Sequence, residues 1–123
     1  MLQRWQRKFG YAIRGLASGV RGQDSFWVHL PAAALVVVLA ATLRVYLWQW
    51  CVLILCITIV LVAEYFNSVI EVLVRKLHPE RDAEIARALD SAAAAVLIAS
   101  IGAVLVGFIV LGRALMGVLV SWF

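Results

Sequence analysis

The chain has 123 residues, a formal net charge of +4 and a hydrophobic fraction of 65%, and its mean hydropathy is +0.99. This length allows one domain, and the composition is typical of a membrane protein and excludes an ordinary soluble enzyme. Beside so much apolar sequence, we interpret the positive charge as contact with anionic lipid headgroups and predict no nucleic-acid partner. Walker-type phosphate loops, zinc-ligand spacings and dinucleotide-binding glycine patterns do not occur in the sequence.

The first element, residues 1–22, is predicted to be an amphipathic helix. Its apolar residues recur at helical spacing, and its basic residues occupy the other faces. This composition is typical of a helix that lies in the membrane interface. The apolar positions are Leu2, Trp5, Phe9, Ile13 and Leu16, and the basic positions are Arg4, Arg7, Lys8 and Arg14.

Three apolar runs follow, and each is predicted to be a transmembrane helix. These helices are placed at about residues 28–47, 48–74 and 90–112. The polar break before the first run contains Asp24 and Ser25, either of which can cap that helix. In the polar connection before the last run, a short separate helix is expected to start at Pro79. The prediction is an all-α membrane protein with a single domain over residues 1–123.

A polar stripe lies on the second predicted membrane helix. Glu64, Asn67 and Glu71 stand at positions i, i+3 and i+7, so their side chains share one helix face. A carboxylate in an apolar membrane segment is costly unless it faces water, a partner group or a metal. One alternative is that both acids simply lie at the headgroup level and reach water. We favour a functional stripe of oxygen ligands.

The spacing separates the roles of the stripe residues. At 1.5 Å rise per residue, Glu64 and Glu71 are roughly 10 Å apart along the helix axis, too far to share one metal ion. Asn67 and Glu71 are one turn apart and could share one. Hard oxygen ligands of this kind suit Mg²⁺, and therefore a nucleotide polyphosphate. Glu64, deepest in the membrane, is then the candidate general base for a hydroxyl at the headgroup level.

The basic residues predict the orientation of the chain in the membrane. Nine of the 11 Lys and Arg residues precede the first membrane helix or lie between the second and the third, and only Arg44 and Arg113 lie on the opposite side. The side with nine is expected to be cytoplasmic, and the N-terminus lies there. Glu64, Glu71 and Asp90 then all lie towards the side where ATP is available.

The stretch Glu64-Tyr65-Phe66-Asn67-Ser68-Val69-Ile70-Glu71 resembles the signature of the small bacterial membrane lipid kinases, the diacylglycerol kinase and undecaprenol kinase family. That signature is close to E-x-x-N-[ST]-x-I-E, and every fixed position fits. Asp90, followed by small residues, is similar to the start of the family's last membrane helix. The resemblance implies an ATP- and Mg²⁺-dependent lipid kinase of the bacterial inner membrane. It also implies a homotrimeric bundle with active sites shared between subunits.

The resemblance also suggests roles for individual residues. In the family, a basic residue and an aromatic residue of the N-terminal segment help to enclose the nucleotide. The predicted nucleotide-binding residues are Arg7, Tyr11, Arg14, Arg75 and Asp90. The predicted metal ligands are Asn67, Glu71 and Gln23, and Gln23 stands where the family has an acid. The predicted lipid-binding residues are Phe26, His29 and Ser68.

The leading hypothesis is a kinase that moves the γ-phosphoryl group of ATP to a lipid hydroxyl, with Glu64 as the catalytic base. Diacylglycerol and undecaprenol both fit as acceptors. His29 matches a position that is often His in the undecaprenol-type members of the family, and together with the Trp-rich loop it slightly favours undecaprenol. Gln23, Arg75 and Leu89 replace an acid, an acid and a lysine that the family usually has. These departures motivate one alternative, a degenerate member that binds lipid or nucleotide without turnover. A structural membrane protein whose polar stripe only joins helices is the other alternative.

Overall fold

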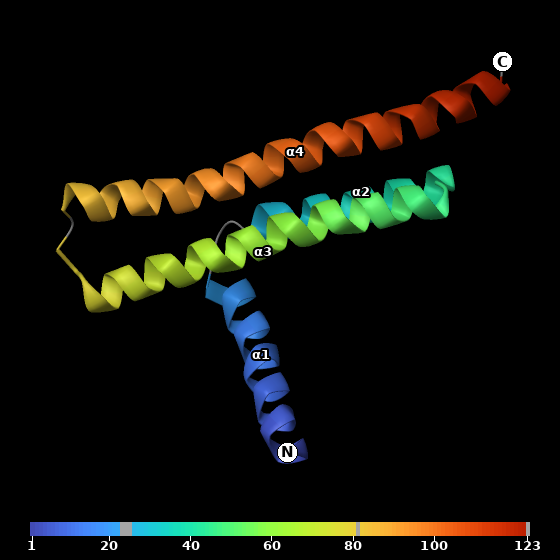
Figure 1. The fold of residues 1–123 in the computed structure, drawn as a ribbon. Helices are drawn as coiled ribbons and strands as arrows, with labels where there is room; N and C mark the ends of the chain where they lie inside the picture. The colour runs from blue at the N-terminus through green and yellow to red at the C-terminus, as the bar shows by residue number, and fades with distance from the viewer. Residues whose placement is uncertain (23–25, 81, 123) are drawn as a thin grey trace.

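A computed structural model describes residues 1–22, 26–80 and 82–122, apart from the side chains of residues 19–22. Its helices are α1 (Leu2–Gly22), α2 (Phe26–Leu43), α3 (Leu47–Leu77) and α4 (Ala83–Trp122). Helices α2, α3 and α4 lie side by side as a bundle, and α1 leaves that bundle at a steep angle (Figure 1). The described part of the chain is therefore all-helical, as predicted. The predicted helix caps Asp24 and Ser25 lie outside the described residues.

Helices α2, α3 and α4 are each long and apolar enough to cross a membrane, so the three predicted spans are confirmed as candidate spans. Many of their large apolar side chains are exposed, including Leu55, Phe108 and Ile109. Apolar surface of this extent is unfavourable in water, so these faces need lipid or another chain around them. The placement of α1 in the membrane interface stays a prediction.

The last helix differs from what the sequence led us to expect. Instead of a short helix and a separate span, α4 is one unbroken helix of 40 residues. It begins where the Asp82 carboxylate accepts a hydrogen bond from the backbone N–H of Ile85 (2.8 Å), which is an N-cap arrangement. Residues 83–95 are rich in alanine and contain neither Gly nor Pro, so nothing interrupts the helix. At about 60 Å, α4 is twice as long as the hydrocarbon core is thick, and part of it must extend beyond the membrane.

The turn between α2 and α3 is tight and is built around Arg44. Arg44 has a φ of 52°, and its N–H donates a hydrogen bond to the Ala41 carbonyl (3.3 Å). The N–H of Val45 donates to the Ala40 carbonyl (3.3 Å). This pair of bonds is a Schellman motif, in which glycine usually occupies the position of positive φ. An arginine in the left-handed conformation costs roughly 1–2 kcal/mol, so the side chain at this position is unusual.

The packed core of the bundle lies beside this turn. Ala40, Val45, Leu53 and Val110 are buried against one another and join α2, the turn, α3 and α4. Glu64 lies eleven residues beyond Leu53 on α3, which corresponds to roughly 16 Å along the helix axis. The three helices are thus packed against one another beside the turn, and the polar stripe begins about three helical turns away from this core.

Candidate functional site

A contact between Glu64 on α3 and His29 on α2 forms the centre of the candidate site. The Glu64 side chain is only 3% exposed, and its Oε1 lies 3.1 Å from Nδ1 of His29. The ring is not aligned for a hydrogen bond, so this is a close polar contact at ion-pair distance. The structure therefore brings together two predicted site residues that are far apart in the sequence.

The second carboxylate oxygen of Glu64, Oε2, is buried and has no hydrogen-bond partner within the described residues. A buried polar atom without a partner is costly, so a ligand that donates a hydrogen bond to it gains affinity. A lipid hydroxyl is such a donor, and a carboxylate can also take its proton. The geometry of Glu64 is compatible with the predicted role of general base.

Asn67 and Glu71 form the second part of the polar stripe. The Asn67 amide donates a hydrogen bond from Nδ2 to Oε1 of Glu71 (3.0 Å). Both side chains are partly buried. The amide oxygen of Asn67, Oδ1, is buried and has no hydrogen-bond partner within the described residues. The hydrogen bond therefore fixes the amide so that its oxygen remains available as an acceptor or a ligand.

These two residues form a partial fit to a magnesium ion. Among the described residues, no group of three or more His, Cys, Asp and Glu side chains could hold a metal ion. Mg²⁺ in nucleotide sites is commonly held by one or two carboxylates together with substrate phosphates and water. The Glu71 carboxylate alone meets that smaller requirement, whereas the Asn67 amide presents its NH₂ group to Glu71 and would have to turn to offer its oxygen to the same ion. Gln23, the third predicted ligand, lies outside the described residues.

Two of the predicted lipid-binding residues are engaged within the protein. The Ser68 hydroxyl is buried and donates a hydrogen bond to the backbone carbonyl of Glu64 (2.9 Å). Such a bond to the preceding turn satisfies a hydroxyl within its own helix. Phe26 is 1% exposed and packs against Tyr65, with 4.8 Å between ring centroids and 57° between ring planes. Both residues thus pack around the site, and their contact with a lipid stays a prediction.

Tyr65 is a site residue that the sequence reasoning missed. Its hydroxyl donates a hydrogen bond to the backbone carbonyl of Leu16 on α1 (2.6 Å). This bond links the helix that carries Glu64 to the helix that carries Tyr11 and Arg14. The sequence does indicate that this hydroxyl needs a partner, because a tyrosine in a membrane span usually makes a hydrogen bond through its hydroxyl group. The identity of that partner follows only from the angle between α1 and α3.

The predicted nucleotide-binding residues are exposed and spread over three helices. On α1, the Arg14 guanidinium lies 5.3 Å from the ring centroid of Tyr11, a cation–π contact. Arg7 is exposed on the same helix, Arg75 is exposed near the end of α3, and Asp90 is exposed on α4. In the described part of the chain, no hydrogen bond or ion pair joins any of these residues to the polar stripe. A single chain does not assemble them into one site.

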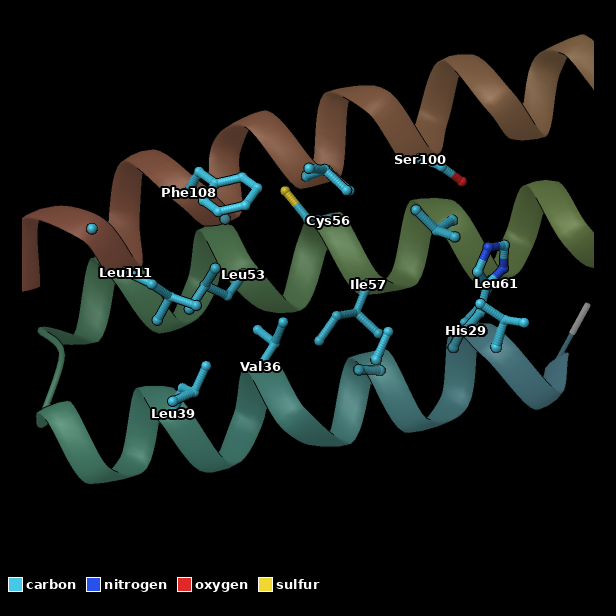
Figure 2. Close-up of a pocket in the computed structure, with 18 of the residues that line it drawn as sticks. His29, Val36, Leu39, Leu53, Cys56, Ile57, Leu61, Ser100, Phe108 and Leu111 are labelled. Carbon is cyan, nitrogen blue, oxygen red and sulfur yellow. The ribbon is translucent and has the colours of Figure 1, made fainter. Parts of the chain in front are cut away.

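An apolar groove leads away from the Glu64–His29 contact. It encloses about 630 Å³ between α2, α3 and α4. His29 lies at one end, and Leu39 and Leu111 lie towards the other (Figure 2). The hydroxyl of Ser100 also lines the groove, and it is buried without a hydrogen-bond partner in the described structure. The groove is of the size and chemistry that suit a hydrocarbon chain.

The fold and the site define a class, the helical membrane proteins that hold a buried carboxylate in a membrane span. A model of the family described as prokaryotic diacylglycerol kinase matches residues 10–111. The chain therefore belongs to the prokaryotic diacylglycerol kinase family, which confirms the resemblance drawn from the signature. The match includes all of α2 and α3 and most of α1 and α4. No match was found among the curated proteins. The family indicates kinase chemistry with a nucleotide and a lipid as substrates.

Proposed function

We propose that the protein is an ATP-dependent lipid kinase that phosphorylates the hydroxyl group of a membrane lipid. Family membership supports the reaction class. The single observation that carries the mechanism is the buried, unpartnered Oε2 of Glu64. The sequence contains no Walker-type loop, which is the phosphate-binding motif of many soluble ATP-binding proteins. The catalytic groups must then come from the membrane helices themselves.

Glu64 acts as the general base in this proposal. Its Oε2 accepts the proton of the lipid hydroxyl while the hydroxyl oxygen forms a bond to the γ-phosphorus of ATP. The bond from that phosphorus to the bridging oxygen breaks, and ADP leaves with the electron pair. His29, in contact with the other carboxylate oxygen, holds Glu64 in place. The burial of Glu64 excludes water that could compete with the lipid hydroxyl.

Asn67 and Glu71 are proposed to hold the magnesium ion that accompanies ATP. When bound, Mg²⁺ neutralises charge on the phosphate oxygens. Because the present hydrogen bond directs the amide NH₂ group to Glu71, the amide turns in this proposal to offer its oxygen to an ion held by that carboxylate. Because Asn67 and Glu71 follow Glu64 along one face of α3, the phosphates are placed on the side of the base that is nearer the membrane surface.

The remaining nucleotide contacts are proposed to come from several subunits of a homotrimer. Among the described residues, no hydrogen bond or ion pair joins Arg7, Tyr11, Arg14 or Asp90 to the polar stripe, nor Arg75, which lies one turn beyond Glu71 on α3. The exposed apolar faces of the bundle leave room for other copies of the chain. A second copy of the chain can supply cations to the polar stripe of the first. We place the nucleotide side in the cytoplasm, with the protein in a bacterial inner membrane and its N-terminus inside.

The lipid acceptor is proposed to lay its hydrocarbon chain in the apolar groove, with its hydroxyl at Glu64. The groove starts at His29, which contacts Glu64, so a chain lying in it brings a terminal hydroxyl to the carboxylate. Both diacylglycerol and undecaprenol meet this requirement, and His29 slightly favours undecaprenol. The competing proposal, binding without turnover, rests on the departures at Gln23, Arg75 and Leu89.

A radiolabelled-ATP assay tests the proposal directly. Purified protein in mixed micelles is supplied with Mg²⁺ and with diacylglycerol or undecaprenol, side by side. We expect labelled phosphate in one of the two lipids, and the preferred alcohol identifies the acceptor. Retention of lipid or nucleotide without labelled product from either alcohol would support the degenerate alternative instead.

A further inference from the structure

A second pocket lies at the opposite end of the bundle from Glu71, where α2 turns into α3 beside the last turns of α4. It encloses about 650 Å³. Figure 1 shows this turn and the C-terminal end of α4 at the same end of the bundle. Its polar lining residues are Arg44, Tyr46, Gln49, Arg113 and Ser121. The kinase reaction proposed above uses none of them.

The pocket is lined by two arginines that stand alone in their segments of the sequence. Residues 26–74 contain no Lys or Arg other than Arg44, and residues 88–123 contain none other than Arg113. Arg44 and Arg113 both line it. The sequence has no Asp or Glu in residues 26–63 or 91–123, so no acidic side chain of these segments can neutralise the two guanidinium groups. Among the described residues neither guanidinium group has an ion-pair partner, and two such cations at a membrane boundary favour an anionic ligand. A guanidinium group pairs best with a carboxylate or a phosphate, through two parallel hydrogen bonds.

The backbone conformation of Arg44 is a second, independent observation. Its φ of 52° and the two hydrogen bonds of the turn define a position that glycine would fill without strain. The turn itself therefore does not require an arginine. Non-glycine residues in strained conformations are characteristic of functional positions. The strain is explained if the Arg44 side chain, which reaches the same pocket as Arg113, has a ligand.

The rest of the lining fits a lipid headgroup. The Gln49 side chain accepts a hydrogen bond at Oε1 from the backbone N–H of Tyr46 (2.9 Å), and this fixes its amide so that the NH₂ group is the free donor. Tyr46 and Trp48 line the pocket and are exposed, as is typical of residues at the level of the headgroups. Val45, Ile109 and Val110 form an apolar wall of the pocket, which suits the acyl chains that follow a lipid headgroup.

We propose that this pocket binds the phosphate of an anionic phospholipid headgroup through Arg44 and Arg113. The ligand chemistry is a phosphodiester carried on acyl chains. The bilayer at the level marked by Tyr46 and Trp48 supplies such groups at high local concentration. The inference does not depend on the kinase reaction, because it concerns another end of the bundle and other residues.

The test compares lipid retention by purified full-length protein in a non-ionic detergent. Phosphatidylglycerol and phosphatidylcholine are titrated separately, and bound lipid is counted by native mass spectrometry. The test variant is Arg44→Gly with Arg113→Gln. The control is Lys76→Gln with Arg87→Gln, which removes the same charge at the other end of the bundle. Because glycine suits the backbone at position 44, Arg44→Gly alone removes the guanidinium group without straining the turn, and its melting temperature shows whether the fold survives.

We expect the double variant to lose affinity for phosphatidylglycerol by at least about tenfold, the scale of one lost charge-assisted contact. Phosphatidylcholine retention and the control variant stay as in the wild type, and Arg44→Gly melts no lower than the wild type. Unchanged retention of phosphatidylglycerol in the double variant overturns the proposal. Equal competition by inorganic phosphate also overturns it, since the site would then bind free anions. Loss of the oligomer with unchanged lipid retention assigns the two arginines to a contact between chains.

Discussion

His29 on α2 and Glu64 on α3 are joined by a contact of 3.1 Å between Nδ1 and Oε1, the only polar side-chain contact between these two helices among the described residues. The carboxylate is almost fully buried, and its other oxygen has no partner in the described structure. This contact therefore fixes the position of a carboxylate whose burial costs free energy, and it leaves one carboxylate oxygen for a ligand. One oxygen of Glu64 thus contacts His29, and the other is left for a substrate.

Replacing His29 with leucine should destabilise the bundle and lower turnover. The Glu64 carboxylate then loses its 3.1 Å contact with His29, and removing one partner of a buried polar contact costs about 1–3 kcal/mol. Thermal unfolding in detergent measures the loss. His78→Leu is the matched control, because that side chain is exposed and its removal should change little. In the double variant with Glu64→Leu, stability should return without activity, since no polar group remains buried. An additive loss in the double variant would contradict the coupling.

Replacing Tyr65 with phenylalanine should weaken ATP binding and leave the rate of phosphoryl transfer to the lipid nearly unchanged. The ring keeps its packing against Phe26, but the hydrogen bond to the Leu16 carbonyl is lost. Because α1 carries the proposed nucleotide contacts Tyr11 and Arg14, we expect KM for ATP to rise roughly twofold to tenfold with little change in kcat. Steady-state kinetics measure the split. Tyr46→Phe removes a hydroxyl at the far end of the bundle and should leave both constants unchanged, and equal effects of the two variants would count against this role.

Arg75 should matter more for ATP binding than Arg87. Leu89 stands where the family usually has a lysine, so another cation must meet the phosphates. Arg75 lies one turn beyond Glu71 on α3, whereas Arg87 points away from the side of Leu89 on α4. We expect Arg75→Ala to raise KM for ATP by roughly threefold to tenfold, and Arg87→Ala to have little effect.

If Arg75 meets the phosphates, Leu89→Lys alone should bring little gain in turnover, because two cations then crowd one phosphate site. The assay of labelled lipid measures this. If Leu89→Lys instead switches on kinase activity in an otherwise silent protein, the degenerate alternative is correct and the compensation by Arg75 is not.

The proposed orientation can be tested by cysteine labelling. In a background without Cys51 and Cys56, a cysteine at Glu80 should react with an impermeant reagent only from the cytoplasmic side. A cysteine at Tyr46, which is well exposed, should react only from the other side. The reverse pattern would separate the polar stripe from the compartment that supplies ATP. The structure favours Tyr46 over the nearby Gln49 for this purpose, because Gln49 is buried.

Much of the helical architecture could be predicted from the sequence. The apolar runs predict three spans because few other structures accommodate such segments, and the spacing of Glu64, Asn67 and Glu71 predicts a shared face. The hydrogen bond from Asn67 to Glu71 follows from that spacing, because it is local to one helix. The extent of α4 was predicted incorrectly, because Pro79 and the charged connection resemble a boundary while Asp82 provides the cap.

Contacts between helices could not be predicted in the same way. The distance from His29 to Glu64 and the bond from Tyr65 to Leu16 depend on the angles and rotations at which helices pack, and one sequence does not determine these. The strain at Arg44 was hidden for the same reason, since an arginine near a turn gives no indication of its φ. The nucleotide contacts also remain predictions, because they require groups that a single chain keeps apart.

The measurement that tests the central claim most directly is the transfer of radiolabelled phosphate by the wild type and by Glu64→Gln. Glutamine keeps the shape of the side chain but cannot take a proton. We predict that labelled lipid forms in the wild type, and that turnover in Glu64→Gln falls by at least about 100-fold with the oligomer and ATP retention unchanged. Near-normal turnover in Glu64→Gln would contradict the assignment of Glu64 as the base.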